Sequence, residues 1–173
     1  MIQIAAYQGV SFISRLIRWQ TRSQYSHIAI QFTDDLWVRL GGREHYIGAG
    51  NVIEAWKGGV RQAVDISESH DPKTLVDLFE FAVPLTADEE QAMAAFLVRQ
   101  LGKGSDYRAI IRCLTREPED HWHRQTWCCS ELAFEAALTC GRRLLERCAA
   151  WEIPPRDVPR SPLLKYIEQK ITT

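Results

Sequence analysis

The sequence predicts an α+β fold built on a mainly antiparallel sheet. Two observations predict it: segments with strand-like alternation gather between residues 25 and 83, and helix signals dominate after residue 86. Strands that precede helices in this way are typical of α+β domains. A third observation is a cysteine at the start of a predicted late helix. We expect that helix to pack against a small antiparallel sheet or partial barrel.

Periodicity predicts the early elements. Residues 11–20 combine apolar side chains with interspersed arginines, which suits a short amphipathic helix. Residues 25–32 alternate, with His27 and Ile28 on opposite faces of the expected strand. We expect a hairpin partner over residues 36–40, ended by Gly41-Gly42. Further strands are expected at residues 51–57 and 75–83.

Capping signals predict the later elements. Thr86 and Glu89 form a capping box, and the helix behind them should run to Leu101, where Gly102 stops it. A second helix begins at the cysteine pair and ends near Gly141. The remaining expectations are a helix over residues 107–114, a polar loop over residues 117–125, and a last helix from Ser161-Pro162 through Lys170.

Composition is that of a globular protein of one domain, residues 1–173. Apolar residues make up 46% of the chain and charged residues 25%, which suffices for a single hydrophobic core. The formal net charge is −1, with both signs interspersed. This pattern offers no basic field, so we expect no nucleic-acid partner.

Cysteine usage and the N-terminal stretch bear on the compartment. Five cysteines without regular spacing do not form the pattern of a disulfide framework, which favours a reducing environment. The first residues lack a basic segment and a small-residue cleavage site, and no apolar run approaches the length of a membrane span. We therefore expect a cytoplasmic protein without stable membrane insertion; the oligomeric state is left open.

Two adjacent cysteines begin the second late helix, and helical spacing separates their environments. Cys129 starts a stripe of core-facing residues at i+3, i+4, i+7 and i+11, whereas Cys128 is rotated by about 100° from it. A helix N-terminus favours a thiolate. Cys129 is therefore a candidate nucleophile; the alternative is a small buried hydrophobe. The other three cysteines are expected to be structural.

His27 and Glu54 are the candidate partners of that thiol. A thiol needs a neighbouring base to become a good nucleophile near neutral pH. Glu54 lies in an otherwise apolar strand, where a carboxylate is costly unless it is exposed or paired. Pairing with His27 would orient the imidazole, as the third member of a triad does. The alternatives are a histidine satisfied by local hydrogen bonds and a glutamate facing water.

A second cluster offers residue types that bind metals. His121 and His123 precede the cysteine pair, so imidazole and thiol ligands lie close in sequence. The spacing matches no standard zinc pattern, and the motif of the zinc deaminases is absent. We expect a polar loop with surface histidines, no metal and no cofactor.

Several short motifs, taken in order, resemble the circularly permuted branch of the NlpC/P60 papain-like superfamily. This group includes YiiX- and YaeF-like proteins and is related to lecithin–retinol acyltransferase. In this branch the histidine precedes the cysteine. The matching segments are Ile13-Ser14-Arg15-Leu16-Ile17, Tyr25-Ser26-His27-Ile28-Ala29-Ile30, Val52-Ile53-Glu54-Ala55 with Gly58-Gly59-Val60, Asp106-Tyr107, and Cys129-Ser130-Glu131-Leu132.

The resemblance implies a papain-like fold and assigns roles. Cys129 would be the nucleophile, His27 the general base and Glu54 the residue that orients it. Tyr107 and Tyr25 would stand near the substrate or the oxyanion. The implied activity is a cysteine hydrolase of amidase or peptidase type, acting on a small peptide, a murein-derived fragment or an acyl lipid. The alternatives are an acyltransferase or lipid esterase of the lecithin–retinol acyltransferase type, and a non-catalytic ligand-binding accessory protein.

Overall fold

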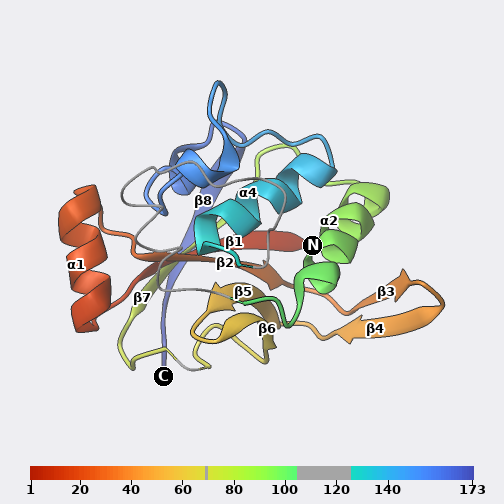
Figure 1. Cartoon of the computed structure of the whole chain (residues 1–173), viewed down its shortest axis with the longest axis horizontal. Coiled ribbons are helices and arrows are strands. Elements are labelled where there is room, and N and C mark those ends of the chain that lie inside the picture. The colour runs from red at the N-terminus through yellow and green to blue at the C-terminus, as the bar shows by residue number, and fades with distance from the viewer. Residues whose placement is uncertain (69, 105–125) are drawn as a thin grey trace.

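The computed structural model describes residues 1–68, 70–104 and 126–173. Its centre is a six-stranded sheet in the order β6-β5-β2-β1-β7-β8, and all neighbouring strands run antiparallel (Figure 1). The strands are β1 (Ile2–Gln8), β2 (His27–Phe32), β5 (Val52–Trp56), β6 (Gly59–Ala63), β7 (Leu75–Phe81) and β8 (Leu164–Ile171). The predicted α+β class with an antiparallel sheet is confirmed.

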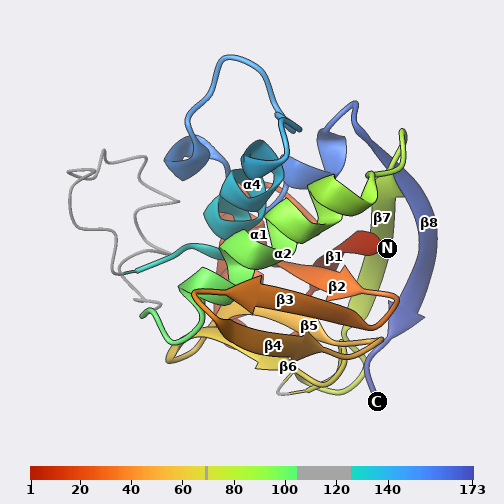
Figure 2. The ribbon, with the colours of Figure 1, turned by 90° about the vertical axis from the view of Figure 1, so that its right-hand side faces the viewer.

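The described helices lie mostly on one face of this sheet. Figure 2 shows α2 and α4 stacked above the strands and the β3–β4 hairpin beside α2. The α-helices are α1 (Phe12–Thr21), α2 (Ala87–Gln100) and α4 (Cys129–Thr139), and the short 3-10 turns are η2 (Ala150–Glu152) and η3 (Val158–Arg160). The three α-helices were predicted with nearly these bounds. Thr86 and Glu89 form the expected capping box of α2.

Each face of the sheet has its own apolar cluster. On the helix side, Ile28 and Ile30 of β2 pack with Leu132, Ala133 and Ala136 of α4. On the other side a smaller cluster consists of Ala5, Tyr7, Ala29, Val52, Ala63, Ile66, Val76 and Leu78. The cysteine helix therefore packs against the sheet as predicted. It covers the face of β2 that carries Ile28 and Ile30, opposite to the face that carries Ala29.

The first strand, β1, was missed in the sequence. It lies in the middle of the sheet, between β2 and β7, and side chains on both of its faces are buried. A strand buried on both faces reads as a continuous apolar run, so the period-two signal disappears. Strand β6 was missed as well, because the sequence predicts no strand between residues 57 and 75. Lys57-Gly58 is instead a two-residue hairpin loop between Trp56 and Gly59.

The predicted hairpin partner at residues 36–40 pairs differently from the expectation. Strand β3 (Leu36–Leu40) pairs with β4 (Arg43–Ile47) in a separate two-stranded sheet. Gly41 and Gly42 both have positive φ, 55° and 80°, which is what a two-residue type I′ turn requires. The glycine pair therefore reverses the chain and starts a new strand, where we had expected only the end of one.

The expected final helix is wrong. Residues Leu164–Ile171 form β8, which pairs along the whole of β7. Ser161 and Pro162 make only a turn, in which the Leu164 N–H donates to the Ser161 carbonyl at 3.1 Å. Without β8, the backbone groups of β7 would be unpaired at a sheet edge. This long-range pairing outweighs the local helix signal. The helix expected over residues 107–114 and the loop over residues 117–125 lie outside the described residues.

Candidate active site

Neighbouring strands bring His27 and Glu54 together. His27 is the first residue of β2 and pairs with Tyr7 of β1, while Glu54 is the central residue of β5, the strand on the other side of β2. Both side chains are buried, with 6% and 1% of their side-chain surface exposed. His27 Nε2 lies 2.7 Å from Glu54 Oε2. The pairing that the sequence predicted is therefore present.

Two further residues satisfy the Glu54 carboxylate. Arg61 of β6 stands opposite Glu54 in the hairpin register and donates from Nε to Oε1 at 3.0 Å. His70, from the segment between β6 and β7, places Nε2 at 3.1 Å from Oε2. The buried carboxylate is thus held by one cation and two imidazoles, which offset the cost of removing its charge from water.

Cys129 reaches this network from the first turn of α4. The N-cap residue of α4 is Cys128, whose backbone N–H lies 3.5 Å from the Glu131 carboxylate. The Cys129 thiol is hydrogen-bonded to His27, and the backbone groups of Ile28 and Ser130 also hydrogen-bond to its sulfur. Because Glu54 takes Nε2 of the imidazole, Nδ1 is the nitrogen left for the thiol.

The charges in this group stabilise one another. Burial alone would lower the pKa of His27, but the neighbouring Cys129 sulfur and Glu54 carboxylate outweigh it and raise that pKa to about 9. Burial would raise the pKa of Cys129, but the His27 imidazolium and the backbone hydrogen bonds lower it below its ordinary value. Likewise, hydrogen bonds from His27 and His70 overcome burial and lower the pKa of Glu54. The arrangement favours a thiolate beside an imidazolium.

Sequence reasoning did not identify His70 or Arg61. Arg61 had a usable signal, since recognising the β5–β6 hairpin would have placed it opposite Glu54. His70 had none, because it lies in a polar segment without periodicity. Its position is fixed by long-range contacts. The His70 ring stacks on the Tyr7 ring, with centroids 4.1 Å apart and an angle of 19° between the planes. The centroid of the Trp56 ring lies 4.5 Å from that of His70. Burial lowers the pKa of His70, which favours its neutral form.

The two tyrosines predicted for the site fare differently. The Tyr25 hydroxyl donates to Asp77 Oδ2 at 2.7 Å, so its proton is committed to a carboxylate and not to a developing oxyanion. Burial and this hydrogen bond raise its pKa to about 12. Tyr107 lies outside the described residues, as do His121 and His123, so the roles expected of them stay predictions.

The remaining cysteines in the described residues are distinct from Cys129. Cys128 is buried and disulfide-bonded, so its sulfur is not a competing thiol. Cys140 and Cys148 are free, and burial raises the pKa of both. Among the three free cysteines described, Cys129 alone has a lowered pKa.

The same network includes a set of residues that could hold a metal ion. His27, Glu54 and His70 each offer one ligand atom, and these atoms all lie within 4.8 Å of one another. Two imidazoles and a carboxylate are a ligand set that zinc accepts. The distances of 2.7 and 3.1 Å from Glu54 Oε2 are those of direct hydrogen bonds, however, and Arg61 already neutralises the carboxylate. The donor atoms of this set therefore suit a metal ion. Its negative charge suits one only partly, because Arg61 already neutralises the carboxylate.

Comparison with known proteins bears on the fold. No family model and no curated protein matches the chain. Among solved structures, the chain is similar to the metalloprotein YiiX from Escherichia coli O157:H7, DUF1105. The TM-score is 0.68 at 19% identity, and the match covers 97% of this chain and 96% of that chain. At this identity the likeness shows the fold: this chain has a YiiX-like α+β fold.

Helix length and polarity bear on membrane spanning. Among the described residues, no helix has both the length and the apolar character needed to cross a bilayer.

Proposed function

We propose that this protein is a cysteine hydrolase that acts through Cys129, His27 and Glu54. The observation that carries the proposal is the contact between a thiol at a helix N-terminus and an imidazole whose other nitrogen lies 2.7 Å from a buried carboxylate. Nucleophile, base and orienting group in hydrogen-bonded order are the signature of nucleophilic acyl transfer. The resemblance to permuted NlpC/P60 proteins, in which the histidine comes first, supports the same roles.

The reaction would proceed in two balanced steps. The Cys129 thiolate attacks a carbonyl carbon, the bond to the leaving amine or alcohol breaks, and the His27 imidazolium gives its proton to that leaving group. The product of this step is a thioester. Water then attacks the thioester carbonyl, His27 takes its proton, and the acid leaves as the Cys129 sulfur is released. The backbone N–H of Cys129, in the first turn of α4, is a candidate oxyanion donor.

Arg61 and His70 would act through Glu54 and not on the substrate. Their hydrogen bonds hold the carboxylate ionised and fix its orientation. Glu54 in turn holds His27 in the orientation that presents Nδ1 to the thiol. The substrate classes supported by the resemblance are a peptide or murein-derived amide and an acyl-lipid amide or ester. Transfer to an acceptor other than water would use the same three residues.

The test is acylation by an activated ester. Wild-type protein incubated with 4-nitrophenyl acetate should release a burst of nitrophenol, and peptide mapping should place the acetyl group on Cys129. Cys129→Ser should abolish the burst, and His27→Ala should lower its rate by on the order of 10²–10⁴-fold. Cys140→Ser is the matched control, because this thiol is also free but lies at the far end of α4. Acetylation spread evenly over the free cysteines would refute the proposal.

A second candidate function is metal binding by His27, Glu54 and His70. Two observations favour it: the convergence of three ligand atoms and the description of the structurally similar YiiX as a metalloprotein. A bound divalent ion would supply a Lewis acid at this position. The thiol would not be a ligand, since it faces the other nitrogen of His27. This candidate departs from the sequence-based expectation of no metal.

Zinc titration by calorimetry separates the two candidates. If the network is a metal site, wild-type protein should bind about one equivalent of zinc, and His70→Gln should weaken that binding by at least about 100-fold, since even partners of ligands contribute 10–100-fold. His70→Gln retains Cys129, His27 and Glu54, so a hydrolase should keep most of its acylation burst. The absence of zinc binding in the wild type would exclude the metal candidate.

A further inference from the structure

Helix α1 exposes its largest apolar side chains. Phe12 is 82% exposed, Trp19 77% and Leu16 47%. The residues that α1 buries are small or polar for the most part: Ser14, Ile17 and Thr21. A surface helix ordinarily buries its apolar stripe and turns its polar residues outward. In α1 the arrangement is inverted.

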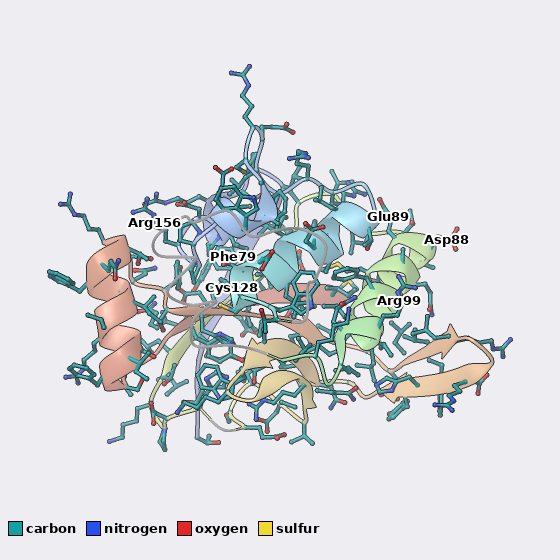
Figure 3. The ribbon with its side chains drawn as sticks, in the orientation of Figure 1. Phe79, Asp88, Glu89, Arg99, Cys128 and Arg156 are labelled. Atoms are coloured by element: carbon teal, nitrogen blue, oxygen red, sulfur yellow. The ribbon has the colours of Figure 1, made fainter. Side chains whose placement is uncertain are left out.

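The exposed residues form one continuous ridge. Phe12, Leu16 and Trp19 are spaced i, i+4 and i+7, which places them on one face of a helix with 3.6 residues per turn. At about 100° per residue, this face lies opposite the buried stripe. We call these three residues the outer ridge. In Figure 1, α1 stands at the left edge of the molecule with one side open, and Figure 3 shows several of its side chains projecting away from the other elements.

The outer ridge does not hold α1 in place. Ser11 caps the helix, accepting from the Ser14 N–H at 3.2 Å, and the Thr21 hydroxyl donates to the Ile17 carbonyl at 2.7 Å. Arg18 donates from Nη1 to the Gly9 carbonyl at 3.1 Å. The first two bonds lie within the helix and its cap. Attachment to other segments comes from Arg18 and from Arg156, whose Nη1 donates to the Thr21 carbonyl at the C-terminal end of α1. The helix can therefore lose the outer ridge and keep its attachment.

The charged residues of α1 and of its C-cap are all arginines. Residues 1–33 contain no Asp or Glu, and Arg15 and Arg22 are exposed next to the ridge. A second copy packed symmetrically on this face would bring like charges together. An anionic lipid surface would complement them. Trp, Phe and Leu on one side with Arg beside them is the pattern of helices that lie in a membrane interface.

The position of α1 relates it to the candidate active site. The helix connects the end of β1 to the start of β2, where Tyr7 pairs with His27. It therefore flanks the end of the sheet at which His27 meets Cys129. A surface that engages the outer ridge would lie at this end of the molecule.

We propose that α1 docks the protein peripherally and reversibly on bilayers that contain anionic lipids, with the outer ridge in the interface. A ten-residue helix with three apolar anchors gives weak binding that depends on both apolar burial and charge. The proposal stands apart from the hydrolase proposal, because docking does not require Cys129 to react.

Vesicle flotation of the full chain tests the proposal. Wild-type protein should float with vesicles of phosphatidylcholine mixed with phosphatidylglycerol, much less with phosphatidylcholine alone, and should be released by salt. The triple variant Phe12→Ser, Leu16→Ser and Trp19→Ser should bind at least about tenfold more weakly, since it loses most of its apolar anchor. Trp37→Ser is the matched control, because Trp37 is also exposed (61%) but lies on β3.

Three outcomes would count against docking. Equal binding to both kinds of vesicle would show that anionic lipids do not contribute to binding. A triple variant that floats like wild type would show that the outer ridge is not the binding surface. A concentration-dependent dimer that the triple variant abolishes would assign the ridge to a second copy instead.

Near-identical unfolding midpoints should show that the triple variant folds. The double variant Arg15→Glu and Arg22→Glu should reduce flotation without any change to the ridge. Flotation of Cys129→Ser at the wild-type level separates docking from catalysis.

Discussion

Two buried carboxylates lie on the same sheet and have different kinds of partner. Glu54 is 1% exposed and Asp77 is 4% exposed. Glu54 is held by groups that can carry charge: His27, His70 and Arg61. Asp77 is held by neutral donors: Gln8 at 3.1 Å, Tyr25 at 2.7 Å and Gln169 at 2.7 Å. Burial and hydrogen-bond satisfaction are therefore similar, and the chemistry of the donors differs.

The difference shows why one carboxylate is a candidate for catalysis and the other is structural. The Asp77 network joins β1, β7, β8 and the segment before β2 through donors that do not titrate near neutral pH. Around Glu54, one of the donors is the His27 imidazole, which also contacts the Cys129 thiol. A proton can therefore pass between the sulfur and the imidazole. A buried carboxylate indicates function only when its partners can exchange protons.

The largest predicted effect on folding is at Glu54. Glu54→Ala leaves Arg61 and two histidines without their acceptor, so we expect it to lower the free energy of unfolding by about 3–5 kcal/mol. Asp77→Ala removes an acceptor from neutral donors only, and we expect about 1–3 kcal/mol. Urea unfolding of both variants measures the contrast. If Asp77→Ala is the costlier change, the distinction between the two networks is wrong.

Acid should narrow the stability gap between wild type and Glu54→Gln. The pKa of Glu54 is lowered in the folded protein from an ordinary value of 4.5. A carboxylate with a lowered pKa stabilises the fold above that ordinary value and loses its contribution as the pH falls below it. The wild type should therefore lose its advantage over Glu54→Gln as the pH falls below about 4.5. A gap that stays constant from neutral to acid pH would show that Glu54 is not ionised in the fold.

A smaller effect is expected at His70. His70→Ala removes one hydrogen bond to Glu54 and the stacking on Tyr7, so we expect a loss of about 1–2 kcal/mol in unfolding free energy. Arg61 and His27 still hold the carboxylate. The alkylation rate of Cys129 should therefore fall by less than about threefold, in keeping with a positioning role. A loss of reactivity equal to that of His27→Ala would place His70 in the proton relay itself.

The smallest effect is expected at Tyr25. Tyr25→Phe removes one hydrogen bond to Asp77, which Gln8 and Gln169 still satisfy, so we expect about 1 kcal/mol of destabilisation. The acylation burst should be unchanged. If Tyr25→Phe instead slows the burst strongly while stability is kept, the role near the oxyanion that the resemblance implies for Tyr25 would be supported.

The parts of the fold that the sequence revealed are those with a local signal. Helix α4 and its buried stripe followed from spacing within eleven residues, and His27 and Glu54 stood out within short alternating strands. These patterns record which side of an element is buried, and that was enough to bring Cys129, His27 and Glu54 into one hypothesis.

The parts that were missed depend on distant segments. Strand β1 has no alternation because both of its faces are covered, and β8 forms because β7 offers it an edge. His70 enters the site through contacts with Tyr7 and Trp56, neither of which is near it in sequence. Sequence periodicity contains no information about such partners, so the second histidine and the final strand required the structure.

The hydrolase proposal requires that His27 makes Cys129 a thiolate near neutral pH. Iodoacetamide labelling against pH, with peptide mapping, tests it most directly, and Cys140 and Cys148 serve as internal controls because burial raises their pKa values. At about pH 6 an ordinary thiol, with a pKa of ~8.5, is less than about 1% thiolate. We predict that Cys129 labels far ahead of both controls at this pH, and that His27→Ala removes most of its lead. If Cys129 labels no faster than Cys140 or Cys148 at mildly acidic pH, or if His27→Ala leaves its profile unchanged, the thiolate–imidazolium pair does not exist and the hydrolase proposal fails with it.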